Sequence, residues 1–315
     1  MKMKRTVITE HGMAVRETDR KPYGPGDVLV KNIACGICEG DVVVYKKRDR
    51  LGDRELWPGH EGTGVVEAVG DEVSDFKVGD VVTCLCGAYA QYFTAADHAS
   101  VRVPEGLEPQ TTLGEPLSCV VHAMNRMTVG PHDRVAIVGC GFMGMMSLQV
   151  LKHRGAGHIC AIDPIDWRRE DALRFGADAA CAPADAPRHA TPEKNGTFDI
   201  VVEAAGTPPS LDLCGELIDH HGVINVLATH RTHGGFRTIN VFQWNWKAIT
   251  VVNGHIRRND EKEAALAESV ELMASEAVKM GPLVTLYPLE DADRAFQDLC
   301  NRKTGLYKAA ILPNE

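Results

Sequence analysis

Short apolar runs separated by turn residues fill the first third of the chain. The runs DVLVKNIA (27–34), GTGVVEAVG (62–70) and KVGDVVTCL (77–85) are rich in β-branched residues, which favour strands. Clusters of glycine, proline and aspartate such as PYGPGD (22–27) lie between them and are typical of turns. This pattern predicts a β-rich domain over residues 1–115.

From residue 116 the pattern changes to strands that alternate with helices. The buried strand VAIVG (135–139) precedes the helical pattern FMGMMSLQVLKHR (142–154), and the strand HICAID (158–163) precedes a charged helix at 166–175. Further strands are expected in FDIVVEAAG (198–206), GVINVLA (222–228) and AITVVNG (248–254). Alternation at this spacing predicts parallel βαβ units and a doubly wound parallel sheet over residues 116–252.

The remaining segments complete an α/β fold with two domains. The polar, proline-rich stretch 182–196 is expected to be a loop over the sheet. A helix at about 259–276 is followed by PLVTLYPLEDADRAFQDL (282–299), in which we expect a strand and a helix. Residues 253–315 are therefore expected to return to the first domain.

A glycine array stands at the turn between the first strand and helix of the alternating region. VAIVGCGFMG places Gly139, Gly141 and Gly144 in the spacing G-x-G-x-x-G, with Phe142 and Met143 between the last two. The first glycine permits a tight turn, the second lets the backbone approach a pyrophosphate, and the third allows close helix–strand packing. The N–H groups at the start of the helix then bind the phosphates. A glycine-rich turn without a ligand is the alternative.

Asp163 ends the next strand and favours NAD over NADP. A carboxylate at this place accepts hydrogen bonds from the ribose hydroxyls of the adenosine and repels a 2′-phosphate. Arg168 and Arg169 follow closely and weaken that discrimination. We include Arg168 among the cofactor-binding residues.

Three segments offer donors for a metal ion. CGICEGD contains Cys35 and Cys38, PGHEGTG contains the adjacent His60 and Glu61, and GEPLSC contains Glu115. A thiolate, an imidazole and carboxylates suit a catalytic zinc ion that keeps one position open. The residues alone leave other interpretations: the cysteines as a redox dithiol or a strand-to-turn junction, and the His-Glu pair as a surface pair or a core histidine.

Composition limits the possible partners and the cellular compartment. A chain of 315 residues exceeds the usual size of one core. Its 34 basic and 43 acidic residues give a net charge of −9, which argues against nucleic acid or an anionic membrane as the partner. No stretch resembles a signal peptide or a membrane-spanning helix. The ten cysteines are expected to be free thiols or metal ligands, so we expect a cytoplasmic protein that binds a small molecule.

Five segments, in order, resemble the medium-chain dehydrogenase/reductase family, the zinc-dependent alcohol and polyol dehydrogenases. They are CGICEGD, PGHEGTGVVEAVGDEVSDFKVGDVV, GAYAQYF, the glycine array and the closing GLYKAAIL. The resemblance implies a GroES-like catalytic domain and a Rossmann NAD-binding domain, with hydride transfer between NAD and a substrate. It also implies a homodimer or homotetramer formed through the sheet of the nucleotide-binding domain.

GEPLSC together with GHE resembles most the sorbitol, threonine and sugar dehydrogenase branch of that family. The resemblance implies a zinc ion held by Cys38, His60 and Glu61, with Glu115 bound directly or through water. It implies NAD-dependent oxidation of a secondary alcohol of the polyol, sugar or hydroxy amino acid type. Cys35 is then expected to pack within its strand. A dithiol of the thioredoxin type would open a helix, whereas the residues on both sides here are β-branched.

The chain departs from the family pattern at several positions. In relatives a hydroxyl and a histidine relay the substrate proton, and Gly40 and Val43 stand in their places. Proton removal must then use ordered water, a carboxylate such as Glu61 or Glu115, or the ribose hydroxyl, and we prefer Glu115. Only Cys84 and Cys86 stand where relatives carry a four-cysteine zinc loop, so we expect one catalytic zinc and no structural zinc.

Four further residues each have two interpretations. Lys308, in GLYKAAIL, is expected either to face the cofactor pyrophosphate or to be an exposed strand lysine. Tyr45, Trp57 and Trp244 are candidates for a substrate pocket and equally for the core.

Two other functions remain open at this point. A zinc-independent NADPH-dependent quinone or enone reductase would keep the fold without the metal, although Cys38, His60 and Asp163 argue against it. A non-catalytic NAD-binding protein is supported only by Gly40 and Val43.

Overall fold

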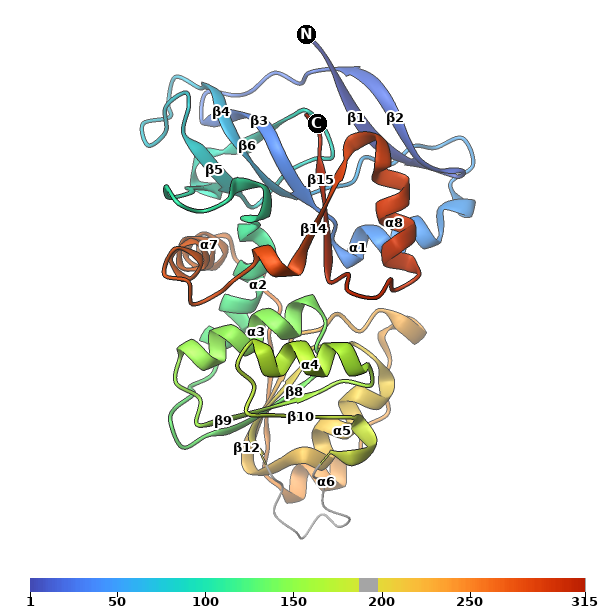
Figure 1. Cartoon of the computed structure of the whole chain (residues 1–315), viewed down its shortest axis with the longest axis vertical. Helices are drawn as coiled ribbons and strands as arrows, with labels where there is room; N and C mark the ends of the chain where they lie inside the picture. Colours follow the sequence, from blue (N-terminus) through green and yellow to red (C-terminus); the bar gives the residue numbers. More distant parts are fainter. Residues whose placement is uncertain (187–197, 315) are drawn as a thin grey trace. The chain divides into compact units, whose positions relative to one another are not determined.

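The computed structural model describes residues 1–186 and 198–314. The chain forms two compact units (Figure 1). Unit 1 comprises Met1–Ser118 and Arg258–Glu315, and unit 2 comprises Cys119–Arg257. The C-terminal segment thus belongs to the same unit as the N-terminal one. The boundaries expected from the sequence were 115/116 and 252/253.

Unit 1 is built on a seven-stranded sheet of order β14-β15-β3-β4-β5-β7, with β6 paired to β3. The β1–β2 hairpin is separate from it. The C-terminal strand β15 pairs antiparallel with β3, with Ala310 opposite Gly36. The strands are β1 (Lys2–Thr9), β2 (Gly12–Asp19), β3 (Asp27–Gly36), β4 (Glu61–Val69), β5 (Val81–Cys84), β6 (Tyr92–Ala96), β7 (Ser100–Arg102), β14 (Val284–Pro288) and β15 (Lys308–Leu312).

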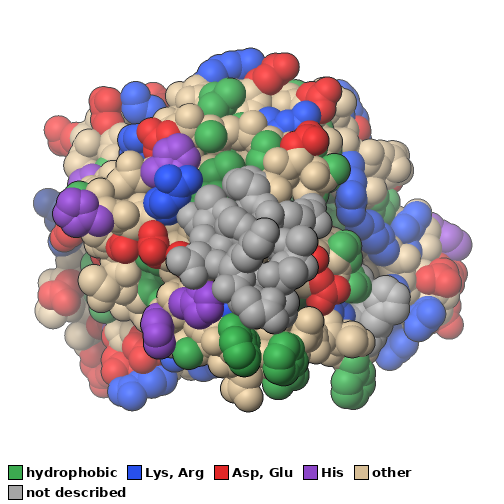
Figure 2. Space-filling model, turned by 90° about the horizontal axis from the view of Figure 1, so that it is seen from below, with side chains coloured by type: hydrophobic (Ala, Val, Ile, Leu, Met, Phe, Trp, Pro, Cys, Tyr) green, Lys and Arg blue, Asp and Glu red, His purple; other side chains and the backbone are tan. Residues whose placement is uncertain are grey.

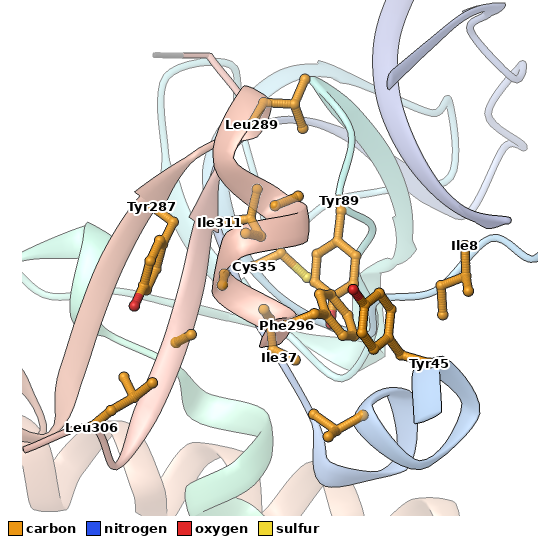
Figure 3. Packing of buried hydrophobic residues seen from close by; sticks show 14 residues of the cluster. Ile8, Cys35, Ile37, Tyr45, Tyr89, Tyr287, Leu289, Phe296, Leu306 and Ile311 are labelled. Atoms are coloured by element: carbon orange, nitrogen blue, oxygen red, sulfur yellow. The ribbon is translucent and has the colours of Figure 1, made fainter. Parts of the chain in front are cut away.

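Apolar side chains from distant segments form a core in unit 1 between β3, β15 and two helices. The helices of this unit are α1 (Glu39–Lys46), α7 (Asn259–Ala274) and α8 (Ala292–Cys300), while α2 (Gly114–Asn125) runs on into unit 2. The Phe296 ring lies 5.0 Å from that of Tyr45 and 6.0 Å from that of Tyr89 (Figure 3). Cys35 is fully buried in this cluster, as expected. Tyr45 is a core residue and not a pocket residue.

The residues after Cys38 form a helix, so the argument from β-branched neighbours was wrong. Cys38 is the N-cap of α1, and the Gly40 N–H donates to its Sγ at 3.4 Å. The acidic side chains of the first turn favour the helix N-terminus. Val42 and Tyr45 are buried, and the burial of this face outweighs the β propensity of the VVV run.

Unit 2 contains a six-stranded parallel sheet of order β10-β9-β8-β11-β12-β13. The chain moves outward from β8 in one direction and from β11 in the other, which makes the sheet doubly wound. The strands are β8 (Arg134–Val138), β9 (His158–Ile162), β10 (Ala179–Cys181), β11 (Phe198–Glu203), β12 (Ile218–Val226) and β13 (Thr250–Asn253), and the helices are α3 (Phe142–His153), α4 (Asp166–Arg174), α5 (Pro208–Leu217) and α6 (Val241–Trp246).

The loop expected at 182–196 lies largely outside the described residues, which here contain only a short 3-10 turn at Pro183–Asp185. Trp244, a pocket candidate, packs against the apolar cluster of unit 2. In the described part of the chain, no helix is both long and apolar enough to span a bilayer.

Candidate metal centre and nucleotide-binding loop

Three metal-binding side chains meet where α1 and β4 begin. The donor atoms of Cys38, His60 and Glu61 all lie within 4.8 Å of one another. No other such group of three was found among the residues that the structure describes. Gly59 precedes His60 with φ of +103°, a conformation that favours glycine and turns the chain into the cluster. A thiol sulfur, an imidazole nitrogen and a carboxylate oxygen are the donors that zinc takes in proteins, so the residues fit this ion.

The surroundings of His60 favour positive charge. A hydrogen bond with Cys38 is the largest influence on its pKa, burial opposes it, and Glu61 and Glu115 reinforce it. Together they raise the pKa of His60 to about 9. A bound cation supplies positive charge at the same point, and its binding would displace the imidazole proton.

Glu115 lies in the first turn of α2, and its charge interacts with those of His60 and Glu61. The residue is half-buried. Burial of the carboxyl group, followed by repulsion from Glu61, raises its pKa to about 7 despite the opposing effects of His60 and Lys308. Its carboxylate is not part of the three-residue group that lies within 4.8 Å. The role of Glu115 as a zinc ligand stays a prediction.

Lys308 forms a buried ion pair with Glu61. Its Nζ donates to Glu61 Oε1 at 2.7 Å and lies 2.5 Å from Oε2. The lysine is 6% exposed and the glutamate 2%. Burial is the largest single influence on the pKa of Lys308 and lowers it, but the charges of Glu61, Cys38 and Glu115 and the hydrogen bond with Glu61 together raise this pKa above its ordinary value. The interpretation of Lys308 as an exposed strand lysine was therefore wrong, and its contact with the cofactor pyrophosphate stays a prediction.

Gly36 leaves the space that this ion pair occupies. A Cβ at Gly36 would overlap Oε2 of Glu61 and lie 2.9 Å from Leu113 Cδ1 and 3.0 Å from Lys308 Cε. Gly36, the first glycine of CGICEGD, is thus required by the buried carboxylate of Glu61, which follows it by 25 positions in the sequence. Sequence reasoning gave this glycine no role.

Cys35 does not share the chemistry of Cys38. Burial raises the pKa of the Cys35 thiol well above its ordinary value, and a thiol is a poor nucleophile and ligand until it ionises. Nearby, the Tyr89 hydroxyl donates to Asp41 Oδ2 at 2.7 Å. Burial raises the pKa of Asp41, whereas Tyr89 and His60 lower it. Cys35 and Asp41 therefore contribute to the packing of this segment and not to the metal-binding group.

The glycine loop of unit 2 has the geometry that its sequence predicts. Gly139 has φ of +100°, and a Cβ there would come within 2.8 Å of Ala205. A Cβ on Gly144 would overlap the carbonyl oxygen of Gly139. Gly141 is the N-cap of α3, and a Cβ there would have only Arg168 Nη1 near, at 4.0 Å. The loop therefore leaves open space at the start of the helix, beside a cation, where phosphates bind in such folds.

Asp163 connects this loop to the end of β9. It is 2% exposed. Its Oδ2 accepts from the Cys140 N–H at 2.8 Å, and its Oδ1 accepts from the Ile165 N–H at 2.9 Å. Arg168 Nη1 lies 3.7 Å from Oδ2. The carboxylate thus shapes the loop, a role that sequence reasoning missed, while its contact with ribose stays a prediction.

A buried acid at the end of β11 was also missed. Glu203 is fully buried, accepts the Ser210 hydroxyl at 2.5 Å, and lies 2.8 Å from His230 Nε2. The Arg237 Nε–H donates to His230 Nδ1 at 2.9 Å. Because β11 neighbours β8, this network holds the chain at the same edge of the sheet as the glycine loop. The only sequence signal was an acid at the end of a predicted parallel strand.

Comparison with known proteins decides the family. The model of the alcohol dehydrogenase GroES-like domain matches residues 24–105, and that of the zinc-binding dehydrogenase matches residues 143–275. L-threonine 3-dehydrogenase of Caldanaerobacter subterraneus is 31% identical over 69% of this chain and 73% of its own length. The chain belongs to the zinc-dependent medium-chain dehydrogenase family. The predicted family and fold class are confirmed, and the protein is an oxidoreductase.

Other relatives of this dehydrogenase cover nearly the whole chain. The probable D-xylulose reductase A of Emericella nidulans is 28% identical over 90% of this chain and 88% of its own. The solved alcohol dehydrogenase of Thermus sp. ATN1 superposes with a TM-score of 0.83 at 23% identity, covering 98% and 99% of the two chains. The latter likeness supports the fold alone.

Replacing Gly36 by alanine tests the space beside Glu61. The new Cβ displaces the Glu61 carboxylate, so we expect zinc affinity to fall about 10- to 100-fold, as when an outer-shell partner is lost. The measurement is competition with a chromogenic zinc chelator. Gly26→Ala is the matched control because a Cβ there has nothing within 4 Å. Wild-type zinc affinity in Gly36→Ala would contradict this account of the glycine.

Proposed function

We propose that this dehydrogenase oxidises a secondary alcohol of the polyol, sugar or hydroxy amino acid type with NAD, using one zinc ion. The observation that carries the proposal is the Cys38, His60 and Glu61 cluster within 4.8 Å, in a chain of a zinc-dependent family. The names of the relatives, a threonine dehydrogenase and a xylulose reductase, support these substrate classes.

Cys38, His60, Glu61 and Glu115 would hold the zinc ion. When bound, zinc acts as a Lewis acid on the alcohol oxygen and lowers the pKa of the hydroxyl group. The ion pair with Lys308 would hold the Glu61 carboxylate in its orientation, as supporting partners of metal ligands do.

The chain must also remove the proton of the hydroxyl group. Neither Gly40 nor Val43 has a side chain that can carry it. We assign this role to Glu115, a carboxylic acid of α2 that interacts with Glu61 and His60 of the cluster. A nicotinamide cofactor held by the glycine loop would supply the hydride-transfer chemistry.

The nucleotide-binding loop would hold NAD through its backbone. The N–H groups at the start of α3 would bind the pyrophosphate, with Arg168 beside Gly141. The buried carboxylate of Asp163 would accept hydrogen bonds from the ribose hydroxyls and repel the 2′-phosphate of NADP.

The remaining cysteines support a single zinc ion and a reducing compartment. Cys84 Sγ lies 3.4 Å from Ser100 Oγ, and Cys86 Sγ donates to the Thr94 carbonyl at 3.5 Å. Burial raises the pKa of both thiols, that of Cys86 to about 12. All ten cysteines are free thiols, which is usual in the cytoplasm. A zinc-independent NADPH-dependent reductase would have no use for the Cys38 cluster.

The outer edge of the unit 2 sheet supports assembly of two or four copies. β13 stands at the end of the strand order, and its Val251 is 46% exposed. Phe242 and Trp246 of α6 are 62% and 53% exposed. Figure 2 shows a face of the molecule on which hydrophobic side chains are exposed among charged ones. An exposed apolar strand edge is a template for pairing with another copy.

Loss of a zinc ligand should abolish turnover and leave the cofactor site intact. Cys38→Ser retains a helix cap and His60→Ala removes the imidazole. We expect both variants to lose bound zinc and at least about 10³-fold in kcat/KM, while NADH binding, followed by fluorescence, stays unchanged. Cys300→Ser, at a half-buried thiol of α8, is the control and should behave as wild type. Full turnover by either zinc-site variant would sink the proposal.

Removal of the Asp163 carboxylate should change cofactor choice. Asp163→Ala removes the group that repels the 2′-phosphate, and we expect the ratio of kcat/KM for NAD over NADP to fall at least about tenfold. The Asp163 variant also loosens the glycine loop, so both cofactors should bind more weakly in absolute terms. Asp166→Ala, an exposed acid three residues away, should leave the ratio unchanged. An unaltered ratio in Asp163→Ala would remove that residue from ribose recognition.

A charge on the strand edge should separate the copies. We expect the wild-type protein to have at least twice the 34.3 kDa mass of one chain by light scattering, and Val251→Lys to shift toward the monomer. Val78→Lys, at a valine of unit 1 that is 63% exposed, is the control. A wild-type monomer at micromolar concentration would contradict this assembly.

A further inference from the structure

Unit 1 contains a cavity of about 330 Å³ that none of the candidate zinc ligands lines. Its walls come from the β1–β2 hairpin, β3, β6 and the segment just before His60. The polar and aromatic side chains among its lining residues are Arg5, Arg20, Lys21, Trp57, Tyr92, Phe93 and Thr94. Three of these are cationic, and none of the described residues that line the cavity is acidic. This concentration of positive charge occurs in a chain whose net charge is −9.

Arg5 is a buried cation in the wall of this cavity. The residue is 6% exposed. Its buried Nε has no hydrogen-bond partner, and among the described residues no carboxylate forms an ion pair with its guanidinium. Its contact is the Trp57 ring, whose centroid lies 4.0 Å from Cζ. A cation–π contact offsets only part of the cost of burying a charge that has no counter-ion.

Two further cations stand at the same cavity. Arg20 Cζ lies 5.5 Å from the centroid of the Tyr92 ring, and Lys21 Nζ lies 5.8 Å from that of Trp57. In the part of the chain that the structure describes, neither forms an ion pair with an acid. All three cations thus rest on aromatic faces instead of carboxylates. The rings hold the side chains in place but leave their charge unneutralised.

We propose that this cavity binds a small phosphorylated metabolite, a phosphomonoester of a sugar or polyol. A guanidinium recognises phosphate oxygens with two parallel N–H groups, and a dianion matches the charge of several cations. The Thr94 hydroxyl can donate to a further phosphate oxygen. The parts of the Trp57 and Tyr92 rings that line the cavity would contact the carbon skeleton, and the cavity volume lies at the lower end of the range for small-molecule sites.

The position of Trp57 connects this site to the metal cluster. Trp57 precedes His60 by three residues, and Gly59, between them, is held in a left-handed conformation against Ala88 and Tyr89. A ligand on the Trp57 ring would order the segment that carries His60. Binding itself does not depend on the proposed reaction, so it is tested without turnover.

The experiment is calorimetric titration of the zinc-loaded protein with NADH present at saturation, so that the glycine loop is filled. The probes are glucose 6-phosphate, inorganic phosphate and glucose, at constant ionic strength. We expect glucose 6-phosphate to bind one per chain, inorganic phosphate to bind several-fold more weakly, and glucose not to bind. Arg5→Met keeps an apolar stem on Trp57 and should weaken glucose 6-phosphate at least about tenfold.

A second variant and a control keep the test independent of folding. Lys21 is exposed, so Lys21→Gln is expected to fold normally and to weaken glucose 6-phosphate at least about threefold. Arg294→Gln removes a cation that is 64% exposed on α8 and should change nothing.

Three results would overturn the proposal. One is the absence of binding by glucose 6-phosphate up to about 10 mM. Another is affinity that neither Arg5→Met nor Lys21→Gln alters, which would place the phosphate elsewhere. Equal affinity for inorganic phosphate and glucose 6-phosphate would exclude a role for the aromatic faces, and with it a metabolite as the ligand.

Discussion

The structure of the metal centre depends on one buried ion pair, that of Glu61 with Lys308. Glu61 opens β4 beside His60, and Lys308 opens β15 at the far end of the sequence, 247 residues away. Because both are excluded from water, each charge is costly without the other. The pair therefore ties the C-terminal strand to the cluster, and Gly36 of the intervening strand β3 leaves room for it.

The features that could be predicted from the sequence are those set by residues close together in the chain. The alternation of strands and helices, the turn at Gly139 and the packing at Gly144 follow from residues a few positions apart. The donors of the metal cluster were recognisable because each stands in a short motif. The helix after Cys38 was missed since its valines favour strands locally, while burial of Val42 and Tyr45 on one face decides the conformation.

What the sequence could not predict depends on contacts between distant segments. A lysine in a strand can be exposed at the surface or buried in an ion pair, and the sequence around Lys308 fits both. The pairing of β15 with β3 places it in the buried pair. The network of Glu203, His230 and Arg237 forms from three segments of unit 2. The cavity beside Arg5 likewise needs the β1–β2 hairpin next to Trp57.

The central claim is that one zinc ion binds at Cys38 and His60. Anomalous diffraction from crystals of the purified protein, recorded on both sides of the zinc absorption edge, tests it most directly. We predict one peak per chain, at about 2.3 Å from Cys38 Sγ and about 2.1 Å from a ring nitrogen of His60. A peak at Cys84 and Cys86 with none at Cys38, in protein that oxidises its substrate, would contradict the claim.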